Sequence, residues 1–523
     1  MTDNARPYHL SRLRRALVYF VTGRLAQAAA RAILILVLVR LLSLPDYGAY
    51  MLLVGLAEMQ LQVASFGILP VGRRYLPQML TSLPAGKLYC FVTTLIGAQL
   101  LVLSVIVLAL WSAWVVVTPW FGFSAHQAYV AKPAVLLFML VPAFRFCSEL
   151  LEALLEQAKS QTARAFMPTG RVLGIGALVA LGLDVNLHTI IMVDVIVTAT
   201  CLVLAWTFLQ ASLRKLHAAD GRGDIPVREM LRFAWHMAAV DLMGATAAPG
   251  AIRLALANTL GVVGSGLFAF LQSLEHLVLR YLPSVLLSGL VRPMLISRAF
   301  QTGGMAVLRD GSSLLFKTNL LIVALGTIVV AVAGDTLVAW ASGGKFTGAG
   351  LTLMLIFLAL AFKAQRSVIE MIMQITGHTS ILRATALVSP LSLLAVWLFA
   401  DQGINVAVSI IVVGSVISNS IAAQVLSRVV DGYVIDWRGL GAIYVLAALA
   451  VLTGALAAEA VPPLAAAGLA VAVYAGSILI VRPFRVEEMH LVEQVLGRRI
   501  ARFARVLCNG RLSGRLTDPT RSI

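Results

Sequence analysis

Charged side chains are scarce in this sequence of 523 residues, where Asp, Glu, Lys and Arg together make up 12%. Soluble domains carry roughly a quarter of their residues as these four types, so the scarcity excludes a chain whose surface lies mostly in water. Apolar residues take their place, at 60% of the sequence with a mean hydropathy of +0.91. These values are typical of a protein that a lipid bilayer surrounds.

Cysteine is scarce too, and the four present show neither a disulfide framework nor the spacing of a metal site. We therefore expect no metal and no cofactor. Acidic residues number 24 against 41 basic ones, which gives a net charge of +17. In a soluble protein, such an excess would suggest that the protein binds nucleic acid. Here its distribution along the chain follows membrane topology, so we expect no nucleic-acid partner.

Long apolar runs fill most of the chain. Each is ~20 to 25 residues long, the length that a helix needs to cross a bilayer core of ~30 Å. Barrel strands need only about ten residues and alternate in polarity, so the runs predict helices. The predicted spans are 16–42, 46–72, 88–112, 133–157, 164–183, 187–211, 232–257, 261–287, 314–340, 350–376, 380–400, 404–427, 439–459 and 463–481.

Basic residues are concentrated in every second connection between these spans. Thirty fall in one set of connections and tails or within the first four residues of an adjoining span, against two, Lys132 and Lys345, in the other set. Cytoplasmic loops carry the excess of basic residues, so this pattern predicts that both termini are cytoplasmic. The connections on the other side are short, the longest lying around 113–132, so we expect no external soluble domain.

An offset of 218 residues aligns the two halves of the chain at several positions. It places Gly48 on Gly266 and the intramembrane Arg145 on Lys363. The interval holds six predicted spans, an even number, so both copies keep one orientation. Repeats of this kind are related by an axis along the membrane normal, with the substrate between them.

We therefore predict an all-α polytopic membrane protein with about fourteen transmembrane helices. Two six-helix lobes related by pseudo-two-fold symmetry would surround a central cavity, followed by two C-terminal helices. The predicted parts are a first lobe at 1–213, a cytoplasmic linker at 214–231, a second lobe at 232–430, two helices at 431–485 and a basic amphipathic cytoplasmic tail at 486–523. The tail suits either an anionic membrane surface or the cytoplasmic helix ends.

Four arginines within the predicted spans are our candidates for a cavity lining, and none of them has an acid three or four residues away. They are Arg24, Arg31, Arg253 and Arg280. A charge at mid-bilayer costs about 2.5–3.5 kcal/mol on insertion scales, so such residues usually face a cavity or a partner. A guanidinium matches phosphate geometry and keeps its charge when desolvated. We predict that these four line a cationic cavity that binds a phosphate or pyrophosphate group.

Acids and further charges also lie within the spans. Glu58, Asp241 and Glu275 could each bind a coupling proton or sodium ion or counter an arginine, and we favour the counter-charge role. The secondary intramembrane charges are Arg145, Glu149, Glu152, Lys363, Arg366 and Glu370. The pairs Arg145–Glu149 and Arg366–Glu370 have i,i+4 spacing, so we interpret them as neutralised pairs. The run AAPG at 247–250 is the expected break in the seventh span.

Several short motifs resemble those of a known family. They are RLLSLPDYGAY at 40–50, RRYL at 73–76, GGKFTGAG at 343–350 and QITGH at 374–378. The resemblance is to the polysaccharide transporter family, the Wzx-type lipid-linked oligosaccharide flippases of the multidrug/oligosaccharidyl-lipid/polysaccharide exporter superfamily. It implies two lobes around a central cavity and movement of polyprenyl-pyrophosphate-linked sugar units between leaflets.

We therefore expect a flippase or exporter, not an enzyme, in a bacterial inner membrane. Its partners would be a polyprenyl-pyrophosphate-linked glycan, membrane lipids, a polysaccharide polymerase and a chain-length regulator. The pathway would make exopolysaccharide, lipopolysaccharide O-antigen or capsule.

Other functions stay open. A lipid II flippase is the nearest alternative. A drug–cation antiporter would carry acids rather than arginines in its cavity, and a polysaccharide polymerase or membrane glycosyltransferase would need a sizeable external loop. The membrane potential, a proton gradient or a sodium gradient would each serve as the driving force.

Overall fold

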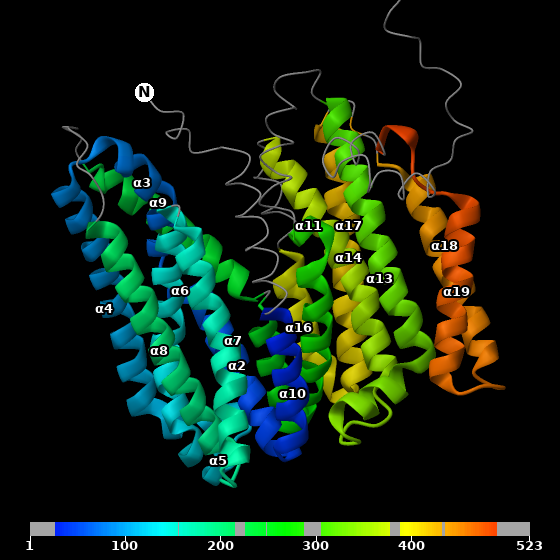
Figure 1. Ribbon diagram of the computed structural model, residues 1–523, viewed down its shortest axis with the longest axis horizontal. Helices are drawn as coiled ribbons and strands as arrows, with labels where there is room; N and C mark the ends of the chain where they lie inside the picture. The colour runs from blue at the N-terminus through cyan, green and yellow to red at the C-terminus, as the bar shows by residue number, and fades with distance from the viewer. Residues whose placement is uncertain are drawn as a thin grey trace, which may run out of the picture. The chain divides into compact units, whose positions relative to one another are not determined.

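The computed structural model describes residues 27–154, 156–214, 225–246, 248–286, 305–376, 387–430, 433 and 435–488. Helices dominate these residues, and no β-sheet occurs among them (Figure 1). Nine of the described helices are long and apolar enough to cross a membrane. The predicted all-α, multi-pass membrane class is confirmed.

By its internal contacts, the chain divides into two compact units, residues 1–270 and residues 271–523. This division falls inside a helix rather than at the predicted linker 214–231, most of which lies outside the described residues. The predicted lobe boundaries stay a prediction.

Unit 1 begins, within the described residues, with helical residues 27–41. Its further elements are α2 (Leu44–Val63), α3 (Ile68–Ser82), α4 (Ala85–Val117), η2 (Thr118–Phe121), α5 (Ala125–Ala131), η3 (Lys132–Leu136), α6 (Leu137–Ala153), α7 (Gln157–Ala180), α8 (Leu187–Arg214), α9 (Val227–Thr246) and the larger part of α10 (Pro249–Tyr281). Helix α6 packs against α4, α7 and α8, and these long helices stand side by side (Figure 1).

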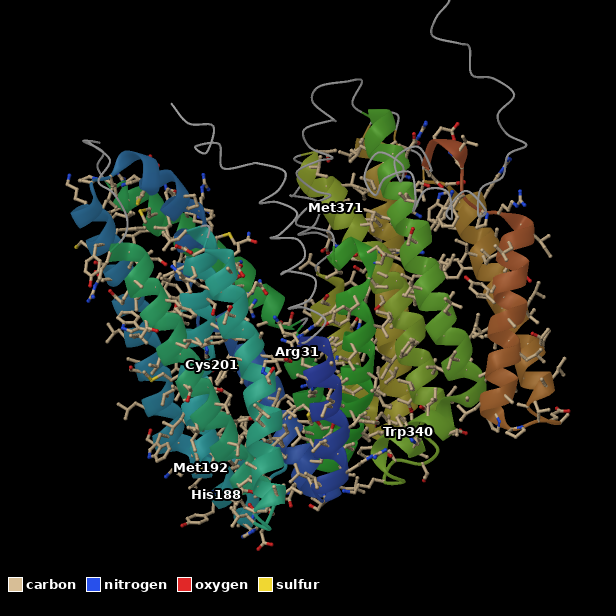
Figure 2. The ribbon with its side chains drawn as sticks, viewed as in Figure 1. Arg31, His188, Met192, Cys201, Trp340 and Met371 are labelled. Atoms are coloured by element: carbon tan, nitrogen blue, oxygen red, sulfur yellow. The ribbon has the colours of Figure 1, made fainter. Side chains whose placement is uncertain are left out.

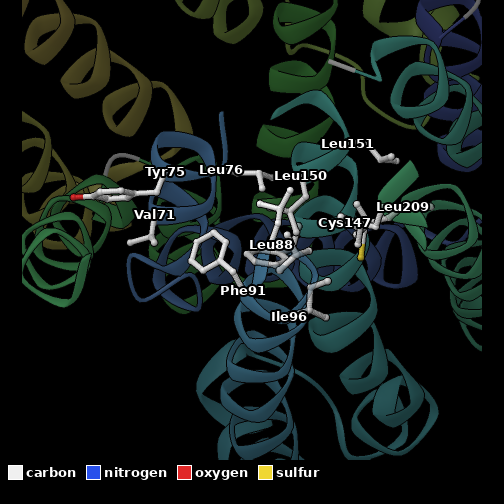
Figure 3. Close-up of a cluster of buried hydrophobic side chains, with 14 of the residues drawn as sticks. Val71, Tyr75, Leu76, Leu88, Phe91, Ile96, Cys147, Leu150, Leu151 and Leu209 are labelled. Carbon is white, nitrogen blue, oxygen red and sulfur yellow. The ribbon is translucent and has the colours of Figure 1, made fainter. Parts of the chain in front are cut away.

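The core of unit 1 lies where α3, α4, α6 and α8 meet. Figure 3 shows Phe91 and Ile96 of α4 near Leu150 of α6, with Cys147 and Leu209 beside them. All five side chains are buried. Lipid is as apolar as these side chains, so close packing rather than exclusion of water stabilises such contacts.

Unit 2 contains the end of α10 and the remaining helices. They are α11 (Pro283–Leu286), α13 (Met305–Ser342), α14 (Gly350–Ile375), α16 (Val388–Phe399), η4 (Ala400–Gln402), α17 (Ile404–Val429), α18 (Trp437–Ala457) and α19 (Pro463–Val481). Helix α13 packs against α14, α18 and α19, and α14 packs against α17.

Helix α10 reverses direction at Gly261. The Ser265 hydroxyl donates a hydrogen bond of 2.9 Å to the Arg253 carbonyl oxygen, although twelve residues of straight helix would span about 18 Å. Gly261 has φ 73° and ψ 176°, a conformation that glycine alone adopts readily. Residues 249–260 and 262–281 therefore form two antiparallel arms, and the predicted boundary between the seventh and eighth spans falls at the reversal.

Two predicted spans are broken inside the membrane. The seventh consists of α9, which ends at Thr246, and the first arm of α10, which begins at Pro249 within the AAPG run predicted as the break. The second consists of α2 and α3, and it is interrupted at Ala64–Gly67, where Phe66 and Gly67 have φ of 41° and 74°. Helix α3 continues to Ser82, beyond the predicted end at residue 72.

The break in the second span lies near the middle of the bilayer. The Gln99 side chain donates a hydrogen bond of 2.8 Å to the Ala64 carbonyl oxygen. Counted from residue 88, where the predicted third span begins, Gln99 lies about 17 Å along α4 at 1.5 Å per residue, near the middle of a hydrocarbon core of ~30 Å. Irregular backbone at this depth is tolerated only where protein buries it or it lines a water-filled cavity.

Glycines let α2 approach α10 closely. A Cβ added to Gly266 would lie 2.7 Å from the Gly48 Cα, and one added to Gly48 would meet the Val262 carbonyl. The predicted repeat equates these two glycines. Equivalent residues of two symmetric halves meet only at the symmetry axis, so this contact is the one expected from the repeat.

Candidate functional site

The four arginines predicted to line a cavity are placed separately. Arg24 lies outside the described residues. Arg31 is half-buried on the helix formed by residues 27–41 (Figure 2). Arg253 belongs to unit 1, whereas Arg280 is half-buried near the end of α10 in unit 2. Their assembly into one cavity stays a prediction.

Arg253 lies in the first arm of α10 and is 2% exposed. Its guanidinium donates to the Met51 carbonyl oxygen at 3.3 Å and lies 3.9 Å from the Glu58 carboxylate. A Cβ at Gly55 would lie 3.0 Å from the Arg253 Cδ, so α2 leaves room for this side chain because Gly55 has none. Glu58 and the glycine spacing of α2 therefore position Arg253.

The pair between Arg253 and Glu58 is loose. The Glu58 side chain is 39% exposed, and the 3.9 Å separation is at the edge of ion-pair distance. A phosphate group binds a guanidinium with two parallel hydrogen bonds, which gives it better geometry toward Arg253 than Glu58 has at this separation.

Glu275 has a tight basic partner within unit 2. Its carboxylate is 1% exposed and accepts a hydrogen bond of 2.7 Å from the Lys363 ammonium. Sequence spacing did not predict this pair, because Glu275 lies on α10 and Lys363 lies on α14. The geometry of Glu58 and Glu275 fits the counter-charge role favoured for the three acids.

Asp241 differs from the other two acids. It lies on α9, opposite the break in the second span, and accepts a hydrogen bond of 2.6 Å from the Ser65 hydroxyl. Among the described residues, no Lys, Arg or His side chain lies within ion-pair distance of it.

Both pairs with i,i+4 spacing are confirmed. Arg145 contacts Glu149 at 2.9 Å, and Arg366 contacts Glu370 at 2.8 Å. Further partners extend the first pair, because Arg73 also contacts Glu149. Glu152 pairs with Arg164 at 3.2 Å rather than with a residue of its own helix. These charges join α3, α6 and α7 at one end of unit 1.

A buried network in unit 1 was not predicted. The Asp194 carboxylate, 1% exposed, lies 3.0 Å from the Arg171 guanidinium and accepts a hydrogen bond of 2.8 Å from the Tyr50 hydroxyl. The network joins α2, α7 and α8. The signal was present in the sequence, since Asp194 is the single acid of the apolar run 187–211.

A second missed network lies in unit 2, around Lys317. Lys317, which lies at the start of the predicted span 314–340, is fully buried on α13 and contacts Asp436 at 2.8 Å and Glu488 at 2.7 Å. Arg485 contacts Asp436 at 2.9 Å. This Lys317 network fastens the residues before α18 and after α19 to α13.

The Lys317 network shifts the pKa of Asp436, which precedes the first residue of α18. Partial burial acts to raise the pKa of this carboxyl. The hydrogen bond and charge of Lys317, the Gly439 amide and Arg485 outweigh burial, so the pKa of Asp436 is lowered. The carboxyl therefore stays ionised in the folded protein.

One cavity of about 220 Å³ lies between α4, α6 and α8. Its lining includes Ile96, Leu100, Phe146 and Trp206, with Gln99 as the one amide. Such a lining has no charge to bind a phosphate. Among the described residues, no group of three or more His, Cys, Asp or Glu could hold a metal ion.

Long apolar helices, broken spans and paired intramembrane charges define a multi-pass membrane protein. The fold is similar to that of the lipid II flippase MurJ in an inward closed conformation, with a TM-score of 0.68 and 12% identity over 89% of this chain and 98% of that chain.

Two transporters share the fold at lower similarity. One is a multidrug resistance MATE family transporter of the MOP superfamily, with a TM-score of 0.54 and 10% identity over 79% of this chain and 94% of that chain. The other is a mutant of the MATE transporter VcmN of Vibrio cholerae, with a TM-score of 0.53 and 14% identity over 80% and 97%. At these identities the likeness concerns the fold. No family model and no curated protein sequence matches the chain.

Proposed function

We propose that this protein is a flippase that moves polyprenyl-pyrophosphate-linked oligosaccharide units outward across a bacterial inner membrane for surface polysaccharide synthesis. The observation that carries the proposal is Arg253, a buried arginine whose guanidinium lies 3.9 Å from the partly exposed Glu58 carboxylate. A permanent cation with a displaceable counter-charge is suited to a pyrophosphate, which is released again after each passage.

The proposed mechanism begins with a cavity open to the cytoplasm. Arg24 and Arg31 lie seven residues apart on one face of the first span and attract the pyrophosphate. Arg253 then exchanges Glu58 for a phosphate oxygen. The sugars occupy the polar space of the cavity while the polyprenyl chain stays in lipid, and rocking of the two halves exposes the cavity outward.

A lipid II flippase is the second candidate. The observation that favours it is the similarity to MurJ, whose TM-score of 0.68 exceeds the 0.54 and 0.53 of the MATE transporters. Both cargoes carry a pyrophosphate on a polyprenyl chain, so the arginines would act alike. The sugar portion distinguishes them, and the short resemblance motifs favour the oligosaccharide.

Transport rather than catalysis follows from the same comparisons, because the structures that share the fold are described as flippases or transporters. The alternation of Lys and Arg supports cytoplasmic termini. A polysaccharide polymerase and a chain-length regulator are the expected partners outside the bilayer core, since they act on the same lipid-linked unit.

Lipid-linked sugars in cells that lack this chain test the proposal. We expect complete polyprenyl-linked repeat units to accumulate on the cytoplasmic side and surface polysaccharide to be lost. Accumulated lipid II with arrested wall synthesis would instead identify the second candidate. Truncated repeat units, or units that reach the outer leaflet without polymer, would contradict transport and indicate a glycosyltransferase or a polymerase.

A further inference from the structure

Asp241 lies deep in the membrane at the place where two broken spans meet. Counted from residue 232, where the predicted seventh span begins, it is about 14 Å along α9, close to half of a ~30 Å hydrocarbon core and comparable to the depth that Gln99 gives for the break at Ala64. Its carboxylate accepts the Ser65 hydroxyl at 2.6 Å. A Cβ at Gly67 would meet the Ala234 carbonyl, so the break rests directly on α9.

The charged groups around Asp241 make their direct contacts with other residues. Helices α2 and α3 pack against α9. On α3, Arg73 contacts Glu149, and Arg74 lies 4.6 Å from the centre of the Phe233 ring. On α2, Glu58 is paired with Arg253. Asp46 of α2 is bonded to Ser43 at the far end of that helix.

Charges on α9 itself give no counter-ion either. The His236 ring lies 2.7 Å from the Arg232 carbonyl oxygen, and both residues lie in the half of α9 that precedes Asp241. Among the described residues, Asp241 thus has a hydroxyl donor and lies in the field of the Arg73 charge, but unlike Glu58 and Glu275 it has no basic side chain within ion-pair distance. An ionised carboxylate without a cation in contact is costly at mid-bilayer, and protonation removes that cost.

We infer that the Asp241 carboxyl is a proton-binding site that couples transport to a proton gradient through its hydrogen bond with Ser65. The inference rests on the proposed function and supplies its driving force. The 2.6 Å separation is typical of a hydroxyl bound to an ionised carboxylate, a bond roughly twice as strong as a neutral one. Protonation therefore weakens the contact that holds the broken second span on α9.

The proton's path follows from this contact. Water on the outer side donates a proton to a carboxylate oxygen of Asp241, and Ser65 then faces a neutral acid. The Ala64–Gly67 break and α9 are released from each other, which lets the cavity change sides. The proton leaves to cytoplasmic water when the cavity opens inward, so one proton enters for each return of the empty carrier.

Purified full-length protein in vesicles tests the coupling. The probe is a polyprenyl-pyrophosphate that carries one fluorescent N-acetylglucosamine, and its outward movement is followed under an imposed pH gradient. One pH unit, acid outside, should speed wild-type movement by up to about tenfold, because it is a tenfold ratio of proton activity. Asp241→Asn should still move the probe under a membrane potential but gain nothing from the gradient.

Two variants serve as comparisons. Asp401→Asn removes an exposed carboxylate of η4 and should respond to the gradient as the wild type does. Ser65→Ala should keep the response but shift its midpoint to higher pH, because the ionised carboxylate loses a hydrogen bond that favours it. A gradient response that persists in Asp241→Asn, or one that follows sodium instead, would overturn the inference.

Proton binding is also measured without any probe. Infrared difference spectra between acid and neutral pH should show a carboxylic acid band in the wild type and in Asp401→Asn that is missing from Asp241→Asn. If no vesicle moves the probe, the proposed function fails while this band still decides the proton site. The same band in Asp241→Asn would refute the assignment of the proton site to Asp241.

Discussion

Arg253 and Arg171 are both largely buried arginines of unit 1, yet their carboxylate partners hold them differently. Asp194 lies 3.0 Å from Arg171 and is itself buried, whereas Glu58 lies 3.9 Å from Arg253 and is partly exposed. A tight, desolvated pair resists exchange of partners. We therefore assign Arg171 and Asp194 a structural role, and we propose that Arg253 binds the substrate.

Substitution of Asp194 tests this division at the level of single residues. Asp194→Ala leaves the Arg171 charge buried without its partner, which should cost about 3–5 kcal/mol of stability. The double variant with Arg171→Met and Asp194→Leu should recover most of that loss. Thermal unfolding in detergent measures both. Equal stability of the single and double variants would show that the pair is not coupled.

Helix α2 contacts other elements through most of its faces. Tyr50 bonds to α8, Gly48 lies against the second arm of α10, and Gly55 makes room for Arg253. The two glycine positions need small side chains because backbones meet there. Small residues at membrane helix crossings have this effect generally.

Gly48→Val should therefore disrupt the crossing of α2 and α10. The added atoms would meet the Val262 carbonyl and side chain, and a rigid backbone cannot yield as a flexible side chain would. We expect little folded protein by size-exclusion chromatography. Gly97→Val on α4 is the matched control, since a Cβ there has no atom within 4 Å. Similar losses in both variants would contradict the crossing.

The Lys317 network should make unit 2 sensitive to acid. The pKa of Asp436 is lowered in the folded protein, so its contribution is complete above the unfolded value of about 3.9 and is lost as the pH falls through the folded value. Asp436→Asn should lower the melting temperature at pH 7 and have a smaller effect in strong acid. An effect of equal size at both pH values would exclude this linkage.

Local sequence patterns predicted those features that depend on neighbouring residues. The spans followed from apolar runs, the start of a new helix at Pro249 from the AAPG run, and the Arg145–Glu149 pair from its i,i+4 spacing. Partners on other helices escaped prediction. Nothing in the spacing indicates that Glu58 approaches Arg253 or that Lys317 contacts Glu488, because these contacts depend on tertiary packing.

At the scale of the whole molecule, the proposed mechanism depends on the fold and on the orientation of the chain in the membrane. The fold of the MurJ flippase extends over 89% of the chain, and the internal repeat gains support from the contact of Gly48 with Gly266. The orientation in the membrane rests on the alternation of basic residues. That orientation decides which way the proposed cargo travels.

Reporter fusions check the orientation. Green fluorescent protein fused after Ile523 should fluoresce, and alkaline phosphatase at the same position should be inactive, because the C-terminus is predicted to be cytoplasmic. Phosphatase inserted near Lys345, in the opposite set of connections, should be active. Activity at the C-terminus would invert the predicted topology.

The most direct test of the central claim is flipping of a polyprenyl-pyrophosphate-linked sugar by purified protein in vesicles under an inside-negative potential. Wild-type protein should move this lipid, and Arg253→Gln should slow it by about 10–100-fold, since a charged hydrogen bond contributes roughly 1.5–3 kcal/mol. A neutral polyprenyl-linked sugar should not move. Equal transport of the neutral lipid, or unchanged flipping in Arg253→Gln, would contradict a cationic path for pyrophosphate.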